Sequence, residues 1–249
     1  MKSLIVANWK MNPTTFREAK KLFEETKHMM GLLKNVSVVV APPAIFLREL
    51  AAGSRKGRIS FAAQNVHYEP RGSFTGEISI PEVKDAKAEY VIIGHAERRA
   101  MGETDDDVRR KVSATLDAGL TPILCVGERT RTANAEHFNF VREQLRAGLA
   151  NVDKRIAKVI VAYEPIWAIG ATAAMRPHDM HEMSIFIRKS VVEKFGEAGH
   201  SIKILYGGSV DGKNAGTMLT HGDVKGLLVG RASVDIQAFT ELLRACSDV

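Results

Sequence analysis

The stretch VIVAYEP, residues 159–165, joins a short apolar run to a lone glutamate and a proline. The residues Val159–Ala162 suit a strand that is buried on both faces, as strands of parallel sheets are. Pro165 has no N–H to donate and cannot continue such a sheet. A buried strand therefore ends at Glu164, which places a carboxylate at the strand's carboxyl end.

Runs of the same kind recur along the 249-residue chain. The predicted strands are Leu4–Ala7, Val36–Ala41, Ile59–Ala63, Tyr90–Ile93, Thr121–Val126, Val159–Ala162, Ile202–Leu205 and Gly226–Val229. Between them, apolar residues with a helical period predict amphipathic helices, among them Thr15–Met30, Asp105–Ala118, Ala135–Leu149 and His178–Phe195.

Eight strands alternating with helices predict an α/β protein whose residues 1–249 form a single closed (β/α)₈ barrel domain. An open, doubly wound sheet is the alternative. It would usually need fewer strands and would carry a glycine-rich turn after the first one, where this chain has Asn8-Trp9-Lys10.

Composition narrows the possible partners and the compartment. The formal net charge of +6 fits a nucleic-acid binder, an enzyme that attracts small anions, or a basic surface. The densest basic clusters, residues 55–58 and 109–111, have no interleaved aromatic residues, so we expect no nucleic-acid partner. The apolar start is too short for a signal peptide or a membrane span. Because Cys125 and Cys246 form no CxxC pair, we expect a cytoplasmic protein with no membrane partner.

In a (β/α)₈ barrel, functional side chains lie where strands end. Those positions hold Asn8 and Lys10, Gln64-Asn65, His95, Glu128, Glu164, Gly207-Gly208-Ser209 and Gly230-Arg231. The last two are glycine-bearing turns that precede helices, a pattern that suits a phosphate group. Glu164 is a candidate general base, His95 a hydrogen-bond donor to a carbonyl, and Lys10 a stabiliser of negative charge. This set suits proton abstraction next to a carbonyl on a small phosphorylated substrate.

Two other patterns carry less weight. GGSVDGKN, residues 207–214, approaches the P-loop pattern, but Asn214 stands where a hydroxyl would hold magnesium. His178 and His181 lie three residues apart, yet no third ligand has a supportive spacing, so we expect surface residues and no metal.

Seven motifs occur in the order in which the triose-phosphate isomerase family has them, and by them the chain resembles that family. They are ANWKMN (7–12), GEIS (76–79), YVIIGHAERR (90–99), CVGE (125–128), AYEPIWAIG (162–170), LYGGSV (205–210) and LLVG (227–230). The resemblance implies a TIM barrel that interconverts dihydroxyacetone phosphate and D-glyceraldehyde 3-phosphate through an enediolate. It also implies a role in glycolysis and gluconeogenesis, and chemistry without a cofactor or metal.

The resemblance also implies roles for single residues. Glu164 would be the general base, a neutral His95 the electrophile, Lys10 a source of charge, and Asn8 a group that orients substrate and His95. Backbone N–H groups near Gly170, Ser209, Gly230 and Arg231 would hold the phosphate. The lid would comprise Pro165, Ile166, Trp167, Ala168, Ile169, Gly170, Ala171, Thr172, Ala173, Ala174 and Met175. Glu128 would meet Trp167, Tyr206 and Ser209 would latch the closed lid, and Thr75 would reach a partner subunit's site in a homodimer.

The chain departs from the family at three informative places. Ala96 stands where the family has a serine that helps to hold the glutamate, so we expect an altered resting position of Glu164. Ala171–Ala174 replace a Thr-Gly-Lys-Thr hinge, which either stiffens the lid or leaves turnover unchanged because backbone N–H groups suffice. Arg231 replaces a second glycine. Its side chain points away from the phosphate or adds a charge to it, and we expect an outward direction; a positive φ would strain it.

The altered lid leaves an alternative function, a barrel that binds a sugar phosphate or a protein partner with little catalysis. The joint presence of Asn8, Lys10, His95 and Glu164 argues against it, because a pure binder has no use for a base opposite an electrophile.

Overall fold

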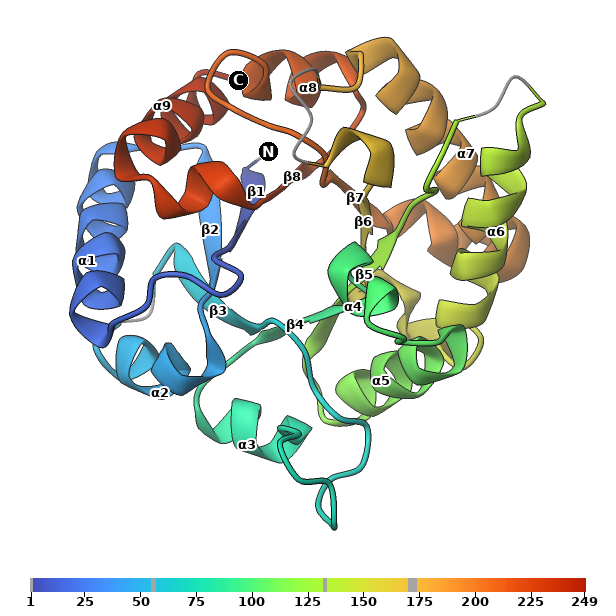
Figure 1. Cartoon of the computed structure of the whole chain (residues 1–249). Helices are drawn as coiled ribbons and strands as arrows, with labels where there is room; N and C mark the ends of the chain where they lie inside the picture. Colours follow the sequence, from blue (N-terminus) through green and yellow to red (C-terminus); the bar gives the residue numbers. More distant parts are fainter. Residues whose placement is uncertain (1, 55–56, 132–133, 170–173) are drawn as a thin grey trace.

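A computed structural model describes residues 2–54, 57–131, 134–169 and 174–249, and it contains a closed barrel of parallel strands in sequence order (Figure 1). The strands are β1 (Ser3–Asn8), β2 (Val36–Ala41), β3 (Ile59–Ala63), β4 (Tyr90–Ile93), β5 (Thr121–Val126), β6 (Ile160–Tyr163), β7 (Lys203–Tyr206) and β8 (Gly226–Val229). The barrel closes where β1 pairs with β8, with Leu4 opposite Gly226 and Ala7 opposite Val229. The (β/α)₈ prediction is confirmed, and the open sheet is excluded.

Helices surround the strands as an outer ring (Figure 1). The α-helices are α1 (Phe16–Leu32), α2 (Ala44–Ala52), α3 (Ile80–Asp85), α4 (Ala96–Ala100), α5 (Asp105–Asp117), α6 (Glu136–Gly148), α7 (Pro177–Phe195), α8 (Ala215–His221) and α9 (Ile236–Ser247). Short 3₁₀ helices are η1 (Asp153–Lys158), η2 (Ile166–Ala168), η3 (Gly196–Ser201) and η4 (Arg231–Val234). None of the helices in the described part of the chain is long and apolar enough to cross a membrane.

The strands bury apolar side chains on both faces, because successive residues of a strand point to opposite sides. Val6, Val39, Ile92, Ile123 and Leu205 belong to a cluster that fills the barrel. Their strand neighbours pack instead into the larger cluster between barrel and helices. This double burial explains why the strands read as continuous apolar runs.

Five predicted strands have the observed bounds, and β1 is longer by one residue at each end. The predictions for β6 and β7 begin and end one residue early. The N–H groups of Val159 and Ile202 instead close the 3₁₀ helices that precede these strands. Tyr163 pairs with Tyr206 at the other end of the two strands. Counting aliphatic residues alone missed these buried tyrosines.

Candidate active site

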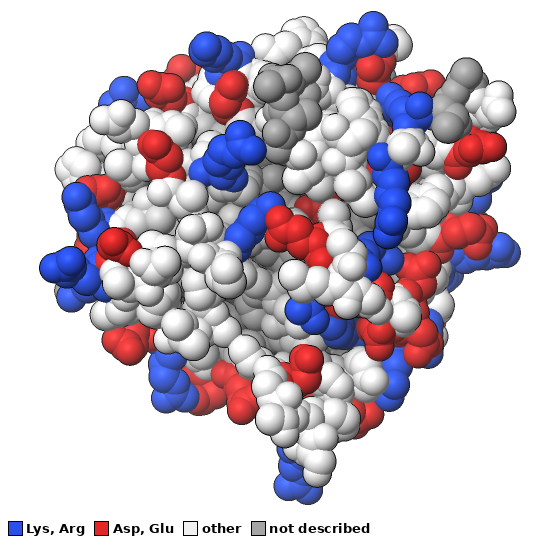
Figure 2. Space-filling model, viewed as in Figure 1, with Lys and Arg blue, Asp and Glu red and all other residues white. Residues whose placement is uncertain are grey.

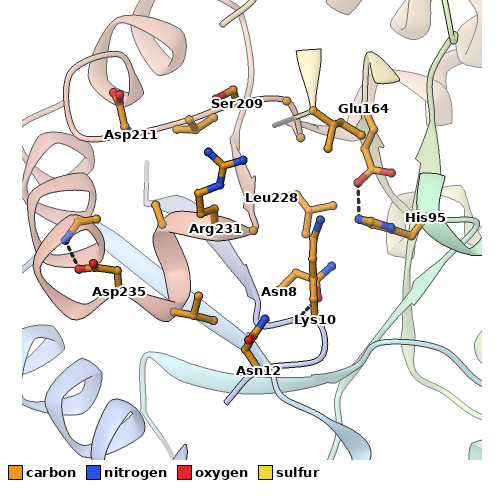
Figure 3. A pocket seen from close by; sticks show the side chains of 18 residues that line it. Asn8, Lys10, Asn12, His95, Glu164, Ser209, Asp211, Leu228, Arg231 and Asp235 are labelled. Carbon is orange, nitrogen blue, oxygen red and sulfur yellow. Dashed lines mark hydrogen bonds and ion pairs between the residues drawn. The ribbon is translucent and has the colours of Figure 1, made fainter. Parts of the chain in front are cut away.

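Glu164 follows β6 and is 2% exposed. Its N–H donates to the carbonyl of Val126 at 2.8 Å, which ties the backbone to the end of β5. One carboxylate oxygen, Oε1, lies 3.1 Å from His95 Nε2 (Figure 3), and the other accepts the N–H of Ala96 at 3.1 Å. Both oxygens of the candidate base therefore contact groups at the start of α4.

His95 is the N-terminal cap of α4 and is 6% exposed. Its Nδ1 accepts the N–H of Glu97 at 3.2 Å. A ring nitrogen that accepts an N–H carries no proton, so the neutral ring is protonated on Nε2. The helix start thus selects the tautomer that donates a hydrogen bond into the pocket.

Lys10 reaches the same region from the end of β1. Its backbone has a φ of 53°, in the left-handed region that is rare for side chains other than glycine. Asn8 Oδ1 accepts its N–H at 3.1 Å, and Gln64 Nε2 donates to its carbonyl at 2.8 Å. The ammonium lies 2.5 Å from Glu97 Oε1. The backbone of Lys10 is therefore held by Asn8 and Gln64, and its ammonium by Glu97 of α4.

The period of two along each strand explains why these side chains meet. Val6 of β1 and Ala162 of β6 point into the barrel. Asn8 and Glu164 lie two residues further on and point the same way, above the apolar filling. The barrel thereby gathers side chains from distant parts of the sequence at the carboxyl ends of its strands.

The start of the predicted lid is attached to β5 through Glu128, which is 2% exposed. Its carboxylate accepts the hydroxyl of Tyr163 at 2.9 Å and the indole N–H of Trp167 at 2.8 Å. Its backbone carbonyl accepts the N–H of Ile166 at 2.9 Å. Burial, reinforced by Glu128, raises the pKa of Tyr163 well above its ordinary value, so Tyr163 remains a donor. The expected contact between Glu128 and Trp167 is present.

The end of the predicted lid is attached to β7. The hydroxyl of Tyr206 accepts the N–H of Met175 at 3.2 Å, and burial raises the pKa of Tyr206 to about 12. The N–H of Ser209 donates to the carbonyl of Ala168 at 3.1 Å. Of the remaining lid residues, Pro165 is buried and Ile169 lines the pocket. Gly170, Ala171, Thr172 and Ala173 lie outside the described residues, and so does most of the unusual hinge; Ala174 is half-buried.

The candidate catalytic side chains border a pocket of about 610 Å³ at the barrel's carboxyl end, a size typical of small-molecule sites. Asn8, Lys10, His95 and Glu164 line one part, and Ser209, Gly230 and Arg231 line another. In Figure 3, Lys10 lies between the His95–Glu164 pair and Arg231. The pocket thus places a carboxylate, a neutral imidazole and an ammonium together.

The backbone of Arg231 opens η4 and does not adopt a positive φ, so the substitution causes no strain of that kind. Its side chain is exposed but borders the pocket, with the guanidinium on the side of Ser209 (Figure 3). Our expectation of a side chain turned away from the pocket is therefore wrong. The turn of η4 directs the side chain along the pocket wall.

The other candidate residues lie outside the pocket. Thr75 is exposed in the segment between β3 and α3, which projects from the barrel (Figure 1). His178 is exposed on α7 beside Asp179, as expected of a surface residue. Within the described residues, no group of three or more His, Cys, Asp and Glu side chains could hold a metal ion.

Cys125 is fully buried inside the barrel beside Glu164. Burial, and then the charge of Glu164, raises the pKa of its thiol well above the ordinary value. Because the thiolate is the reactive form, Cys125 is a packing residue rather than a nucleophile.

Acidic and basic side chains are interspersed on the face that carries the pocket (Figure 2). Among the described residues of this face, no continuous basic stripe is present. On this face the basic side chains are therefore dispersed among acidic ones rather than concentrated in a groove.

Comparison with known proteins agrees with this geometry. A model of the family described as triosephosphate isomerase matches residues 3–246. The chain belongs to the triosephosphate isomerase family. Triosephosphate isomerase of Aquifex aeolicus is 38% identical over 245 residues, which cover 98% of this chain and 99% of the relative. The Endomicrobium trichonymphae enzyme of the same name is 39% identical over 246 residues, 98% of each chain.

Within this family member, the sequence did not point to every residue that shapes the site. The carboxylate of Glu97 contacts the ammonium of Lys10, and the N–H of Glu97 donates to His95 Nδ1. A carboxylate in the first turn after His95 was the available signal. Gly207 has a different role, because a Cβ there would lie 2.8 Å from Glu164 Cγ. Only the approach of β7 to β6 reveals this requirement.

Proposed function

We propose that Glu164, His95, Lys10 and Asn8 carry out the interconversion of dihydroxyacetone phosphate and D-glyceraldehyde 3-phosphate in this protein. The observation that carries the proposal is the convergence of a buried carboxylate, an imidazole protonated on Nε2 and an ammonium in one pocket. In this reaction a base removes a proton from the carbon next to the carbonyl and returns it to the neighbouring carbon.

Glu164 is the base in this proposal. Its carboxylate leaves His95 and Ala96 and turns toward the bound substrate, and the bare Cα of Gly207 leaves room for its side chain. Because the site is buried, little water can compete with the carboxylate for the substrate proton. The nearby thiol of Cys125 stays protonated and does not compete.

His95 and Lys10 stabilise the enediolate. The Nε2–H of His95 donates to the substrate oxygen, and it moves protons between the two oxygens as the double bond shifts. Lys10 supplies positive charge, while Asn8 holds the Lys10 backbone and borders the pocket. Donors that are already oriented cost little reorganisation when charge develops.

Backbone N–H groups near Gly170, Ser209, Gly230 and Arg231 hold the phosphate. Residues 165–175 close over the substrate and exclude water, which protects the enediolate from losing its phosphate. The attachments of Trp167 to Glu128 and of Met175 to Tyr206 support this role, because they lie at the two ends of the segment.

A coupled assay of the purified protein tests the proposal. We expect turnover in both directions, and we expect Glu164→Gln to lower kcat about 10³-fold because a proton-transfer group is lost. Glu49→Gln, on the surface helix α2, is the matched control and retains full activity. Turnover of Glu164→Gln equal to that of the unaltered protein would overturn the assignment of the base.

We also propose a homodimer in the cytoplasm, with residues 1–249 as one domain. Met11, Ile45, Phe74 and Met101 are large apolar side chains that are 89, 78, 42 and 77% exposed. They follow β1, β2, β3 and β4 in turn, so they lie on one side of the barrel mouth, and Thr75 lies beside Phe74.

Two reduced, buried cysteines are consistent with a cytoplasmic location.

The dimer is tested by sedimentation. We expect Thr75→Arg to convert a dimer into a monomer, because it inserts a charge into an apolar contact. Ile185→Arg, at an exposed apolar position on α7, is the control and leaves the mass unchanged. A monomeric mass for the unaltered protein would contradict the proposal.

A further inference from the structure

Arg231 brings a guanidinium to the edge of the catalytic pocket, at a position where the family resemblance implies glycine. It follows Gly230 directly, and a Cβ on Gly230 would lie 3.1 Å from Cε of Lys10. The end of β8 is therefore close to the catalytic lysine. The side chain of Arg231 borders the pocket from the opposite side to Glu164 and His95 (Figure 3).

The acidic side chains on the same part of the pocket wall are engaged with backbone groups. Asp235 accepts the N–H groups of Gln237 and Ala238 at 2.9 and 3.0 Å, which caps α9. Asp211 accepts the N–H of Lys213 at 2.8 Å and that of Asn214 at 3.2 Å. Both carboxylates therefore serve as caps of their own turns.

The positive charge of Lys10 is partly balanced, because its ammonium contacts Glu97. The N–H of Ser209 donates to the carbonyl of Ala168 and has to leave it before it can bind a phosphate. A phosphate dianion entering the pocket therefore gains from a further charged donor at its solvent side. Among the described residues that line the pocket, the cationic side chains are Lys10 and Arg231.

We propose that the guanidinium of Arg231 binds the phosphate group of the substrate and so sets the affinity of this enzyme for phosphate monoesters. The inference rests on the proposed function, since it assigns the phosphate to the Ser209–Arg231 part of the pocket. A guanidinium is planar, stays charged, and donates two parallel N–H bonds to phosphate oxygens. Arg231 is a specificity-determining residue, and the proton transfers remain with Glu164 and His95.

Calorimetry with inorganic phosphate tests the inference without relying on turnover. Arg231→Gly restores the residue that the resemblance implies, and we expect it to weaken phosphate binding about 10-fold, the value of one exposed charge-assisted contact. Arg231→Lys keeps the charge but loses the planar pair of N–H donors. Its affinity for phosphate therefore lies between those of the unaltered protein and Arg231→Gly. Lys213→Ala removes an exposed cation that does not line the pocket, and its affinity for phosphate matches that of the unaltered protein.

Kinetics supply the second readout. The KM of both triose phosphates rises about 10-fold in Arg231→Gly, whereas a general loss of folding would lower kcat and the melting temperature together. A phosphate affinity for Arg231→Gly within two-fold of the unaltered protein overturns the inference, as does an equal loss in Lys213→Ala. Absence of turnover in the unaltered protein would defeat the proposed function, yet the calorimetric comparison would still decide the role of Arg231.

Discussion

The two sides of the pocket are built differently. On the catalytic side, Glu164, His95 and Asn8 are 2, 6 and 5% exposed, and the side chain of each takes part in a hydrogen bond or ion pair. On the phosphate side, Ser209 and Gly230 are half-buried and Arg231 is exposed. Proton transfer requires side-chain atoms at fixed positions, whereas an anion can be held by backbone N–H groups that any residue supplies.

This difference explains where the chain departs from the family resemblance. Arg231 and Ala171–Ala174 belong to the phosphate side and the lid, where side-chain identity is less restricted. Ala96 is the departure on the catalytic side, and its contact with Glu164 uses the backbone N–H, which alanine retains. Substitutions on both sides of the pocket test whether the catalytic side tolerates fewer changes of side chain than the phosphate side.

Among the substitutions that compare the two sides, the largest effect is expected from Gly207→Ala. The added Cβ would lie 2.8 Å from Glu164 Cγ and 3.4 Å from the carbonyl of Tyr163, so the carboxylate must shift. A displaced base lowers kcat/KM about 100-fold, which steady-state kinetics measures. Gly53→Ala is the control, because its Cβ would meet nothing nearer than 3.6 Å. If kcat/KM of Gly207→Ala stays within two-fold, the catalytic side tolerates more than we infer.

A smaller effect is expected at the lid attachment, from Tyr206→Phe. The ring remains, but the hydroxyl that accepts the N–H of Met175 is lost. One net hydrogen bond corresponds to a loss of about five-fold in kcat/KM. More inorganic phosphate should also be released per turnover, because a loosened lid admits water. Tyr90→Phe removes a hydroxyl at the opposite end of the barrel and is the control; an equal loss there would refute a specific latch.

The sequence predicted the barrel because strands buried on both faces appear as apolar runs. The positions that directly follow the strands then pointed to Asn8, Gln64 and Glu164. The partners of these residues could not be predicted in the same way. The contact of Glu164 with Ala96 depends on the distance between the ends of β6 and β4, which no local pattern encodes. The direction of the Arg231 side chain likewise depends on the turn of η4.

Ala96→Ser tests whether the catalytic side is already optimal. A serine hydroxyl adds a second donor beside the N–H that binds Glu164 Oε2. Stabilising the resting carboxylate lowers the free energy of the empty enzyme, so kcat/KM falls about three-fold. Structures without ligand and steady-state kinetics measure the two consequences. Ala100→Ser, exposed on α4, is the control. An unchanged Glu164 rotamer together with unchanged kinetics would count against an altered resting position.

The smallest effect concerns His137, which lies behind the lid attachment on α6 and is 8% exposed. Burial, and then the charge of Arg131, lowers its pKa below the ordinary value, although Glu128 and Glu182 oppose this shift. The unfolded chain therefore binds a proton at a higher pH than the folded chain does. His137 therefore leaves the free energy of unfolding unchanged above the unfolded pKa of 6.5. It lowers that free energy as the pH falls below this value.

Urea unfolding at pH 7.5 and 5.5 measures this dependence. We expect His137→Gln to lose less stability than the unaltered protein between the two pH values, because glutamine takes up no proton. His28→Gln, at an exposed position on α1, should show the same pH dependence as the unaltered protein. If His137→Gln and the unaltered protein lose the same stability between the two pH values, protonation of His137 has no cost in the folded protein. The carboxylates of Glu128 and Glu182 would then balance the added charge. The contact that attaches the lid, between Trp167 and Glu128, would then tolerate a nearby charge, as the phosphate side tolerates changes of side chain.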